Sequence, residues 1–399
     1  MNILIQKFGG TSVSSFERRK LVAKKVLLAK DKGYNPVVVV SAMGRKGEPY
    51  ATDTLLSLLE EKFKENNPLC TDLLLSCGEV LSTVVMCNEL TKHGIDCVPL
   101  TGGQAGIITD NKFSSANLIR VDTERLKTII SQGKVPVIAG FQGITEDGYI
   151  TTLGRGGSDV SAAILGAALN ALEILIYTDV DGIMTADPRI VLEASLIKEM
   201  SYSEVFQFAD QGAKVIHPRA VEIAMKANIP LVIKNTMNNS LGTLINNEEE
   251  YNNSNIITGI THLPNRVQIT VAVNDNLQNS NYYSLLNILA NNTISIDLIN
   301  VFPSQKIFTI DNKDLESFGS VMNSFGIKYS CIEDCSKIAI IGSRMRGIPG
   351  VMAKILNCLS KESIEILQTA DSHTTIWCLL RSENTEKAIN ALHKEFNLG

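Results

Sequence analysis

The run from Val37 to Ser41, which begins with four β-branched valines, constrains the fold of this chain more than any other segment. A strand that is apolar on both faces has to be covered on both sides, which is typical of a parallel sheet between layers of helices. Further strands are expected in apolar runs at residues 2–6, 95–100, 135–141 and 174–178. Helical patterns lie between them, at residues 14–32, 76–92, 122–132 and 159–170. The first half of the chain is therefore predicted to be an α/β domain, with a mostly parallel sheet sandwiched by helices.

The second half of the chain has a different order of elements. It begins after residues 238–255, an Asn- and Glu-rich segment that we interpret as a surface linker. Strand and helix patterns then follow as β-α-β-β-α-β over about residues 263–333, and the cycle recurs over 334–399 without its last strand. A spare strand at residues 256–262 could fill that place. The predicted organisation is one α/β domain over residues 1–245 and two ferredoxin-like α+β domains that share residues 256–399.

Composition and charge exclude several classes of function. The net charge of −5 and the lack of a basic stripe with interleaved aromatic residues argue against a nucleic-acid partner. The run MNILIQKFGG does not have the pattern of a signal peptide, and the most apolar stretch, residues 160–177, is too short and too polar to span a membrane. The eight cysteines are expected to be reduced and mostly buried, without forming a metal site. We therefore expect a cytoplasmic protein with no membrane partner.

The run Lys7–Ser12 (KFGGTS) follows the first strand directly and opens the first helix. Gly9 and Gly10 let the backbone approach a phosphate closely, and the free N–H groups of a helix N-terminus favour an anion. Lys7 adds a full positive charge beside them. Taken alone, a Gly-Gly turn after a strand is more often a plain connector, and the Walker spacing is absent.

A second glycine-rich run, Thr152–Asp159 (TLGRGGSD), also precedes a helix. Its Arg155 has a planar guanidinium that can hold a carboxylate through two parallel hydrogen bonds. Asp159 could cap the helix, or it could contact an amino group or magnesium. Two such anion cradles in one α/β domain are much less expected by chance than one, and ligands of such sheets bind at the C-terminal ends of the strands.

Other runs near strand ends extend this candidate site. Residues 178–189 (TDVDGIMTADPR) form a turn-rich loop that could receive a nucleotide. Lys214 in GAKVIHP lies near a helix boundary, although an isolated lysine is usually a solvated charge, and the neighbouring His217 is interpreted as structural. The run SAMG ends the valine strand, and Glu79 in SCGE could be only a first-turn glutamate favoured by the helix dipole.

In combination, these runs resemble the aspartate kinases of the amino acid kinase superfamily. The motifs KFGGTS, VVVVSAMG, GE followed by LST, TLGRGGSD, TDVDGI followed by DPR, and GAKVIHP stand in the family's order across nearly the whole first 235 residues. The tail, most clearly KIAIIGSRMRGIPGVMAKIL, resembles the tandem ACT domains of the same family. The resemblance implies an amino acid kinase fold followed by two ACT domains, and phosphorylation of the β-carboxylate of L-aspartate by ATP.

The resemblance also implies roles for individual residues. Catalysis would depend on Lys7, Gly9, Gly10 and Asp159. Aspartate would be bound by Ser41, Thr52, Glu79, Arg155, Gly156 and Ser158. Arg155 would hold its α-carboxylate, and Glu79 and Asp159 would surround its amino group. ATP would be bound by Lys7, Thr178, Asp179, Met184, Arg189 and Lys214.

Two of these positions depart from the family's pattern. A longer loop, residues 45–50, precedes Thr52, and Met184 stands where many relatives carry tyrosine. A methionine can cover an adenine or ribose face, but it lacks the hydroxyl group. These departures affect two of the implied roles: the alignment of Thr52 with a residue that contacts aspartate, and the nucleotide contact of Met184.

The chemistry agrees with the implied roles. A carboxylate nucleophile, with a pKa of about 4, is ionised at neutral pH and needs no general base. The difficulty is to bring one anion to another, so catalysis is expected to rest on Lys7, Lys214, backbone N–H groups and Mg²⁺. The implied cofactors are ATP and Mg²⁺, and no metal ligand is assigned to the protein.

The ACT-like tail implies control by an amino acid. Lysine, threonine or both would act as feedback effectors at Ser295, Asp297, Met345, Gly350 and Val351. The segments INVFPSQKIF and QTADSHTTIW lack the Ser-Glu pair that many relatives carry, so the effector's identity is open. Pairing of ACT domains would give a homodimer or a dimer of dimers.

Two rival functions stay open from the sequence. One is another enzyme of the superfamily, acting on glutamate, acetylglutamate, carbamate or a nucleoside monophosphate. The ACT-like tail and Arg155 argue against it. The other is a catalytically inactive amino-acid sensor, and the retention of charged site residues argues against this second rival: Lys7, Arg155, Asp159 and Lys214.

Overall fold

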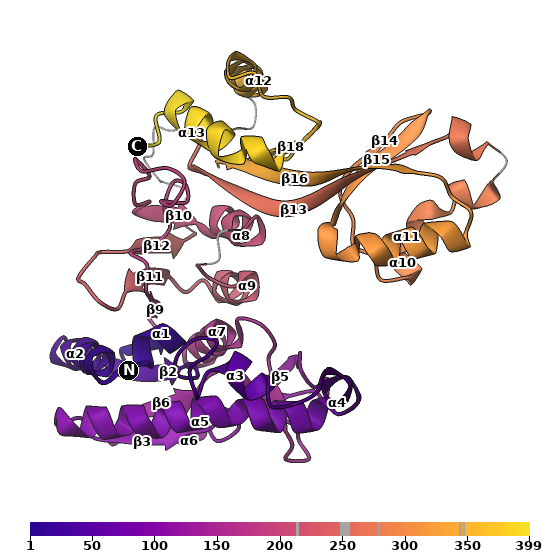
Figure 1. Ribbon diagram of the computed structural model, residues 1–399. Coiled ribbons are helices and arrows are strands. Elements are labelled where there is room, and N and C mark those ends of the chain that lie inside the picture. The colour runs from indigo at the N-terminus through magenta and orange to yellow at the C-terminus, as the bar shows by residue number, and fades with distance from the viewer. Residues whose placement is uncertain (213–214, 248–255, 278, 343–344, 346–347) are drawn as a thin grey trace. The chain divides into compact units, whose positions relative to one another are not determined.

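The computed structural model describes residues 1–212, 215–247, 256–277, 279–342, 345 and 348–399. The chain forms two compact units, and each is described by itself. The first comprises Met1–Ile183, Leu196–Ala209 and Lys214–Asn252, and the second comprises Met184–Ser195, Asp210–Ala213 and Asn253–Gly399. In Figure 1 the first unit is mostly indigo and magenta, and the second is mostly orange and yellow.

An eight-stranded sheet is the centre of the first unit. Its strands are β1 (Ile3–Phe8), β2 (Asn35–Val40), β3 (Cys97–Leu100), β6 (Val135–Ala139), β9 (Glu173–Thr178), β10 (Glu199–Ser201), β11 (Leu231–Asn235) and β12 (Thr243–Asn246). They lie in the order β10-β12-β11-β9-β1-β2-β6-β3, and only the pair of β11 and β12 is antiparallel.

The register of this sheet aligns the ends of its central strands. Phe8 lies opposite both Val40 and Tyr177, and Val40 lies opposite Ala139. The loops that follow β1, β2, β6 and β9 therefore leave the sheet at one edge. This is the edge where ligands of parallel sheets bind.

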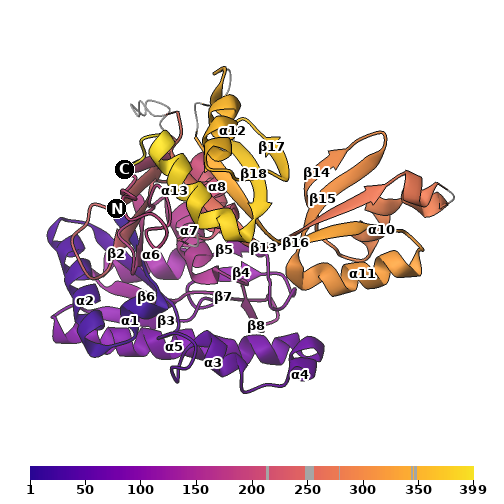
Figure 2. The same cartoon turned by 45° about the horizontal axis from the view of Figure 1, so that its top comes forward.

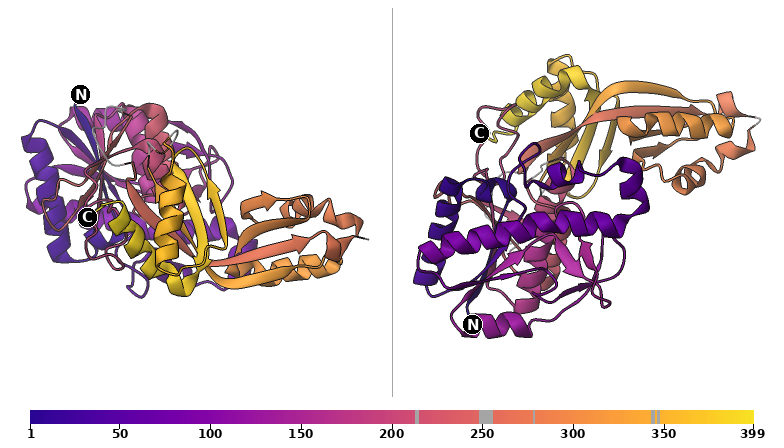
Figure 3. Two further views of the ribbon diagram at one scale, coloured as in Figure 1. Left: turned by 90° about the horizontal axis from the view of Figure 1, so that it is seen from above. Right: turned by 60° about the horizontal axis from the view of Figure 1, so that its bottom comes forward.

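Helices pack on both faces of the sheet because successive side chains of each strand point to opposite sides. Leu4, Phe8, Val38 and Val40 face one core, which also holds buried residues of α2 and α5. On the other face, Gly166 of α7 meets Ile174, which brings that helix close to β9. Figure 3 shows α5 lying across the sheet. The helices are α1 (Gly10–Val13), α2 (Phe16–Asp31), α3 (Thr52–Leu56), α4 (Glu61–Asn66), α5 (Pro68–Lys92), α6 (Glu124–Ser131), α7 (Gly157–Leu169), α8 (Tyr202–Asp210) and α9 (Pro218–Ala227).

A small second sheet, in the order β5-β4-β7-β8, leads into the glycine-rich run at residue 153. Its strands are β4 (Ile107–Thr109), β5 (Leu118–Val121), β7 (Gln142–Ile144) and β8 (Ile150–Thr152). Sequence patterns did not predict it, because strands of three or four residues are too short to show a period.

The longest helix, α5, begins eight residues before the predicted start at Ser76, with Pro68 at its first position. Among the described residues it is the one helix long and apolar enough, by length and composition, to cross a membrane. Half of its most apolar window is buried inside the structure. The apolar stretch at residues 160–177 is instead the buried helix α7 followed by β9.

The second unit is built on a six-stranded sheet with two long central strands. The strands are β13 (Gly259–Ala272), β14 (Asp297–Val301), β15 (Gln305–Asp311), β16 (Ser330–Ile341), β17 (Gln368–Asp371) and β18 (Thr375–Arg381), in the order β14-β15-β13-β16-β18-β17. Figures 1 and 2 show β13 and β16 running through both halves of this sheet.

These long strands correct the sequence prediction. The expected strands at 256–262 and 267–273 are one strand, β13, and those at 327–332 and 337–342 are one strand, β16. Their pairing continues through a register shift between Leu263 and Gln268, where Asn265 has a positive φ of 59°. A bulge of this kind bends a strand without ending it, so it resembles a strand boundary in the sequence.

Two pairs of helices cover the two halves of this sheet. Helices α10 (Leu285–Asn291) and α11 (Leu315–Ser324) enclose one apolar core with the second half of β13, and α12 (Val351–Lys361) and α13 (Thr385–Glu395) enclose another with its first half. The second core also contains Ala186 and Val191, and Ile260 N–H donates to the carbonyl of Thr185 at 2.8 Å. These contacts explain why the segment Met184–Ser195 belongs to the second unit.

Two smaller expectations are wrong. The predicted linker at 238–255 contains strand β12, which pairs with β11 and β10, while residues 248–255 lie outside the described residues. The eight cysteines are free, but only Cys335, Cys358 and Cys378 are fully buried. The exposed thiols lie on the solvent-facing sides of amphipathic elements, which an apolar run in the sequence does not reveal.

Candidate active site

Lys7 and Asp159, from the two glycine-rich runs, form an ion pair at the C-terminal edge of the large sheet. The Nζ of Lys7 lies 2.6 Å from Oδ1 of Asp159, and the two side chains are only 11% and 12% exposed. Lys7 is the penultimate residue of β1, and Asp159 lies in the first turn of α7. Little water reaches this pair, so its charges act on a ligand with little screening.

The Gly9-Gly10 turn holds the start of the chain against the loop after β2. Gly9 N–H donates to the carbonyl of Tyr177 at 3.2 Å, and Gly44 N–H donates to the carbonyl of Gly10 at 3.1 Å. A Cβ on Gly10 would lie 2.6 Å from the carbonyl oxygen of Ala42, so no larger residue fits. The helix that follows, α1, has four residues, and the predicted helix 14–32 is the separate helix α2, capped by Ser15.

Glu79 is a buried carboxyl group beside this turn, with one oxygen left unpaired. Its Oε1 accepts from Ala42 N–H at 3.1 Å, and its Oε2 has no hydrogen-bond partner among the described residues. Burial raises the pKa of Glu79 to about 8, because the charged form is poorly solvated there. An unpaired buried carboxyl is suited to receive a cation from a ligand.

Ser41 begins the loop that follows β2, and Thr52 comes directly after that loop. Ser41 N–H donates to the carbonyl of Phe8 at 3.1 Å, which places it at the same strand edge as Lys7. Thr52 is the first residue of α3. A Cβ on Gly78 would lie 3.2 Å from the Leu55 side chain, so this glycine lets α3 approach α5 one residue before Glu79.

The second glycine-rich run forms a tight loop before α7. Gly154 and Gly156 both have positive φ angles, 78° and 69°, which glycine adopts without strain. Arg155 between them is exposed and has no ion-pair partner within the described part of the chain. Ser158 is buried, and a Cβ on Gly140 would lie 2.9 Å from its hydroxyl oxygen. The loop therefore presents a free guanidinium just before the first turn of α7, which carries Asp159.

The residues expected to bind nucleotide are only partly assembled. Thr178 ends β9, its hydroxyl donates to Asp179, and Asp179 pairs with Arg45. Met184 and Arg189 belong to the second unit, where Arg189 pairs with Asp187 at 2.6 Å. Lys214 lies outside the described residues. The roles of Met184, Arg189 and Lys214 stay predictions.

Arg45, which pairs with Asp179, is a candidate site residue that the sequence did not single out. It lies on the longer loop noted at residues 45–50, and the only signal for it was the inserted length of that loop. His217 caps α9, and its Nδ1 accepts from Arg219 N–H at 3.3 Å. Burial lowers the pKa of His217, which favours the neutral ring that this cap requires and agrees with a structural role.

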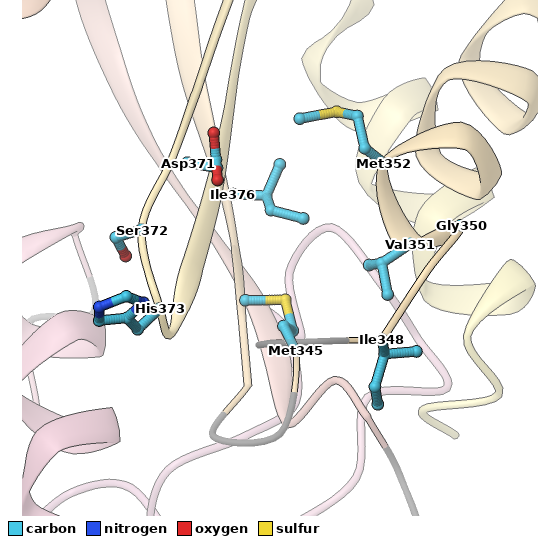
Figure 4. A pocket seen from close by; sticks show the side chains of 9 residues that line it. All are labelled: Met345, Ile348, Gly350, Val351, Met352, Asp371, Ser372, His373 and Ile376. Carbon is cyan, nitrogen blue, oxygen red and sulfur yellow. The ribbon is translucent and has the colours of Figure 1, made fainter.

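Three of the five residues expected to bind an effector line a cavity of about 490 Å³ in the second unit: Met345, Gly350 and Val351. The rest of its lining is Ile348, Met352, Asp371, Ser372, His373 and Ile376. Figure 4 shows Asp371, Ser372 and His373 on one side and Ile348, Val351 and Met352 on the other. Ser295 and Asp297 are not in this lining, and Asp297 instead pairs with the buried Lys337.

Comparison with known proteins agrees with this architecture. The chain matches the amino acid kinase family over residues 2–235 and an ACT domain over residues 330–394. It is 43% identical to aspartokinase 1 of Bacillus subtilis, with 100% of both chains covered. It is 38% identical to an aspartokinase of Geobacillus stearothermophilus, with 100% of this chain and 98% of the relative covered.

Solved structures give the same result. Aspartokinase III of E. coli, in complex with aspartate and ADP, is similar at a TM-score of 0.77 and 26% identity, over 99% of this chain and 100% of that chain. The aspartate kinase of Clostridium acetobutylicum shares the fold at a TM-score of 0.82 and 24% identity, over 99% and 100% of the two chains. The chain therefore belongs to the amino acid kinase family and, within it, to the aspartokinases. The predicted family, fold class and kinase activity are confirmed.

We expect Gly156→Ala to impair the site without unfolding the protein. A Cβ at this position would lie 2.5 Å from the His217 side chain, so the loop that carries Arg155 has to move. A displacement of about 1 Å in a positioning element can reduce kcat/KM on the order of 10²-fold. Steady-state kinetics with aspartate and ATP measure this effect.

Gly148→Ala is the matched control. Gly148 has a similar positive φ of 88°, but an added Cβ meets nothing within 4 Å. Both variants are expected to lose about 1 kcal/mol of stability through backbone strain. Equal activities of the two variants would show that the position of this loop does not matter for turnover.

Proposed function

We propose that this chain transfers the γ-phosphoryl group of ATP to the β-carboxylate of L-aspartate, giving 4-phospho-L-aspartate and ADP. The observation that carries the proposal is the nearly buried ion pair of Lys7 and Asp159, with the half-paired Glu79 carboxyl and the free Arg155 guanidinium around the same strand edge. This arrangement offers separate groups for a phosphate, an ammonium group and a carboxylate.

The chemical step needs charge neutralisation more than proton transfer. A carboxylate oxygen of aspartate attacks the γ-phosphorus, and the bond from that phosphorus to the bridging oxygen of ADP breaks. Because the nucleophile is already ionised at neutral pH, no base has to remove a proton. The Nζ of Lys7, directed toward the site by its contact with Asp159, stabilises the negative charge of the transferring group.

The acceptor is bound through its α-amino and α-carboxylate groups, which leave the β-carboxylate free to react. Arg155 is exposed at the loop tip and has the planar fork that fits a carboxylate. The unpaired Oε2 of Glu79 offers a partner for an ammonium group. These contacts would distinguish aspartate from acids that lack the amino group.

The donor is proposed to be ATP with Mg²⁺. Among the described residues, no three His, Cys, Asp or Glu side chains converge on one point, and Asp159 is already paired with Lys7. Mg²⁺ commonly keeps its waters and binds through substrate phosphates with one or two carboxylates, so it would be carried mainly by the nucleotide. Bound there, it would neutralise part of the charge on the phosphates.

Lys7→Ala is expected to reduce kcat about 10²- to 10³-fold, because one preorganised positive donor to the transferring group is lost. The fold should survive, since Lys7 lies at the end of its strand with its charge at the site. Release of ADP in the presence of aspartate measures the effect, and thermal unfolding checks the fold.

The control is Lys20→Ala, which removes a half-buried lysine of α2 that pairs with Glu17 and lies over the Phe16 ring. It should leave turnover unchanged. Turnover of Lys7→Ala within about threefold of wild type would refute this catalytic role. Assays with glutamate, acetylglutamate and a nucleoside monophosphate test the rival substrates, and binding of aspartate without ADP release would indicate a sensor.

The KM for aspartate is expected to fall as the pH rises from 6 to 8. In the free enzyme Glu79 holds a proton below its raised pKa of about 8, whereas pairing with the substrate ammonium requires the carboxylate. Binding therefore has to displace one proton, and the limiting slope is about tenfold per pH unit. Glu79→Gln should raise the KM and abolish this dependence.

Protein stability gives an independent readout of the same group. Because the folded pKa of Glu79 lies above its ordinary value of 4.5, the folded state holds a proton that the unfolded state has released. The stability that this bound proton gives the folded state is therefore lost as the pH rises from 4.5 toward 8. A difference between wild type and Glu79→Gln that does not change with pH would contradict the assignment.

We further propose that the cavity of the second unit binds an amino-acid effector, lysine or threonine. The N-terminus of α12, with Gly350 as its cap, directs free backbone N–H groups at the cavity and suits a carboxylate. Asp371 on the facing strand suits an ammonium group. The apolar wall of Met345, Val351 and Ile376 has room for a long aliphatic stem, which favours lysine.

The assembly is proposed to be a homodimer or a dimer of dimers, formed through the ACT-like sheets in the cytoplasm. Strand β14 lies at one edge of the six-stranded sheet and exposes Ile299 at 46% and Val301 at 62%. An edge strand with exposed apolar side chains favours pairing with another chain. Sedimentation of the full chain measures this.

Lysine is expected to inhibit turnover and to change the fluorescence of Trp377, the only tryptophan in the chain, which neighbours Ile376 in the cavity wall. Asp371→Asn should weaken lysine binding about tenfold or more, because a charged partner of the ammonium group is lost. The exposed Glu383 of the same unit provides the control variant Glu383→Gln. Equal lysine affinities of the two variants, or an effect of threonine alone, would contradict the choice of lysine.

A further inference from the structure

Asp72 on α5 is a fully buried acid whose side chain forms hydrogen bonds with a loop distant in the sequence. It is 0% exposed. Its Oδ2 accepts from the backbone N–H groups of Ser114 and Thr152, both at 2.8 Å, and its Oδ1 accepts from the Thr152 hydroxyl at 2.8 Å. Burial raises the pKa of Asp72, while these donors oppose the shift. The carboxylate therefore links two backbone segments.

Arg219 on α9 makes the complementary contacts. One nitrogen of its guanidinium donates to the carbonyl of Leu153 at 3.2 Å, and another donates to the carbonyl of Ala116 at 3.2 Å. The planar guanidinium thus joins two carbonyl groups from different segments. A lysine in its place could not span both acceptors in the same fixed geometry.

The two side chains hold the same pair of segments together. Ser114 and Ala116 belong to one segment, and Thr152 and Leu153 belong to the other. A backbone bond from Ala116 N–H to the carbonyl of Thr152, 2.9 Å long, lies between the two links. We call this set of contacts the double clamp. It contains the last residue of β8 and the first residue of the glycine-rich loop.

The double clamp determines where Arg155 can lie. Only Gly154, Arg155 and Gly156 separate the clamped Leu153 from the start of α7 at Gly157. Both glycines have positive φ angles, so they add freedom unless the loop is held at its ends. Ser114 also has a positive φ, 68°, and its N–H is one of those bound by Asp72. Such a conformation persists where the surroundings hold it.

We propose that Asp72 and Arg219 are positioning residues for the carboxylate-binding Arg155, and that they set the affinity for the amino-acid substrate. This inference deepens the proposed function and rests on the proposed role of Arg155. Within the described part of the chain, neither side chain forms a hydrogen bond or ion pair with Lys7 or Asp179, so the nucleotide side of the site does not depend on the double clamp. Loss of the clamp should therefore affect aspartate more than ATP.

Asp72→Ala and Arg219→Ala are expected to raise the KM for aspartate about tenfold or more while the KM for ATP stays within about threefold. Asp72→Asn should restore most of the affinity. Its carbonyl oxygen can accept from both N–H groups, and its amide can donate to the Thr152 hydroxyl once that group rotates. A rescue by the neutral residue separates the hydrogen-bond role from a charge effect.

Glu89→Ala is the matched control on the same helix. Glu89 is also a buried acid of α5, 2% exposed, but it pairs with Lys92 and His93 near the C-terminal end. It should lower thermal stability without changing either KM. If Asp72→Ala does not fold, Arg219→Ala decides the question, because Arg219 is only half-buried.

A double variant tests whether Asp72 acts through Arg155. In the Arg155→Ala background, Asp72→Ala should change the KM for aspartate by less than about twofold, because the residue it positions is already gone. A full effect in that background would overturn the inference, and so would an unchanged KM for aspartate in folded Asp72→Ala.

Arg155→Ala by itself separates this inference from the proposed function. If Arg155→Ala leaves the KM for aspartate unchanged, the proposed role of Arg155 fails, and the inference fails with it. If Arg155→Ala raises that KM while Asp72→Ala and Arg219→Ala do not, only the inference fails.

Discussion

The contact between Lys7 and Asp159 is the interaction on which the rest of the site depends. It joins the end of the central strand β1 to the first turn of α7, and both helix and strand are almost fully buried. A charge pair with so little solvent access is stable only when its geometry is good and its surroundings are fixed. The large sheet meets this condition because β1 lies between β2 and β9, with cores on both faces. The position of the Lys7 ammonium group is therefore fixed by the fold, as its proposed role toward a phosphate requires.

The other site groups occupy the same edge for the same reason. Parallel strands in register end together, so the turn after β1, the loop after β2 and the glycine-rich loop before α7 meet. Glu79 approaches from α5, which Gly78 allows to pack closely against the loop after β2. One oxygen of Glu79 is left unpaired there, and an unpaired buried acceptor destabilises a protein unless a ligand completes it. This carboxyl group therefore combines a local cost in stability with the role proposed for it in binding.

The two halves of the second unit share their long central strands. Neither half of the predicted repeat has enough strands to cover its helices alone, and β13 and β16 supply strand length to both. The segment Met184–Ser195 adds to one of its cores, where the Thr185 hydroxyl contacts Nε2 of His393 at 2.9 Å and the Ser195 hydroxyl donates to the carbonyl of Leu398. In the sequence, the motif TDVDGIMTADPR looks like one continuous loop. In the structure it is divided after Ile183, with its first part in the first unit and its last part in the second.

The sequence by itself determined the class of fold, because a four-valine strand, two glycine-rich runs after strands and a recurring β-α-β-β-α order are local signals. Its motifs also predicted Lys7, Glu79 and Arg155 as site residues. Only the tertiary structure decided that Lys7 meets Asp159, that burial raises the pKa of Glu79, and that Asp72 and Arg219 hold the loop of Arg155. Asp72 lies 80 residues from Thr152, and Arg219 lies 66 residues from Leu153. Contacts across such distances depend on how helices pack on the sheet, and no periodicity within a short window records that packing.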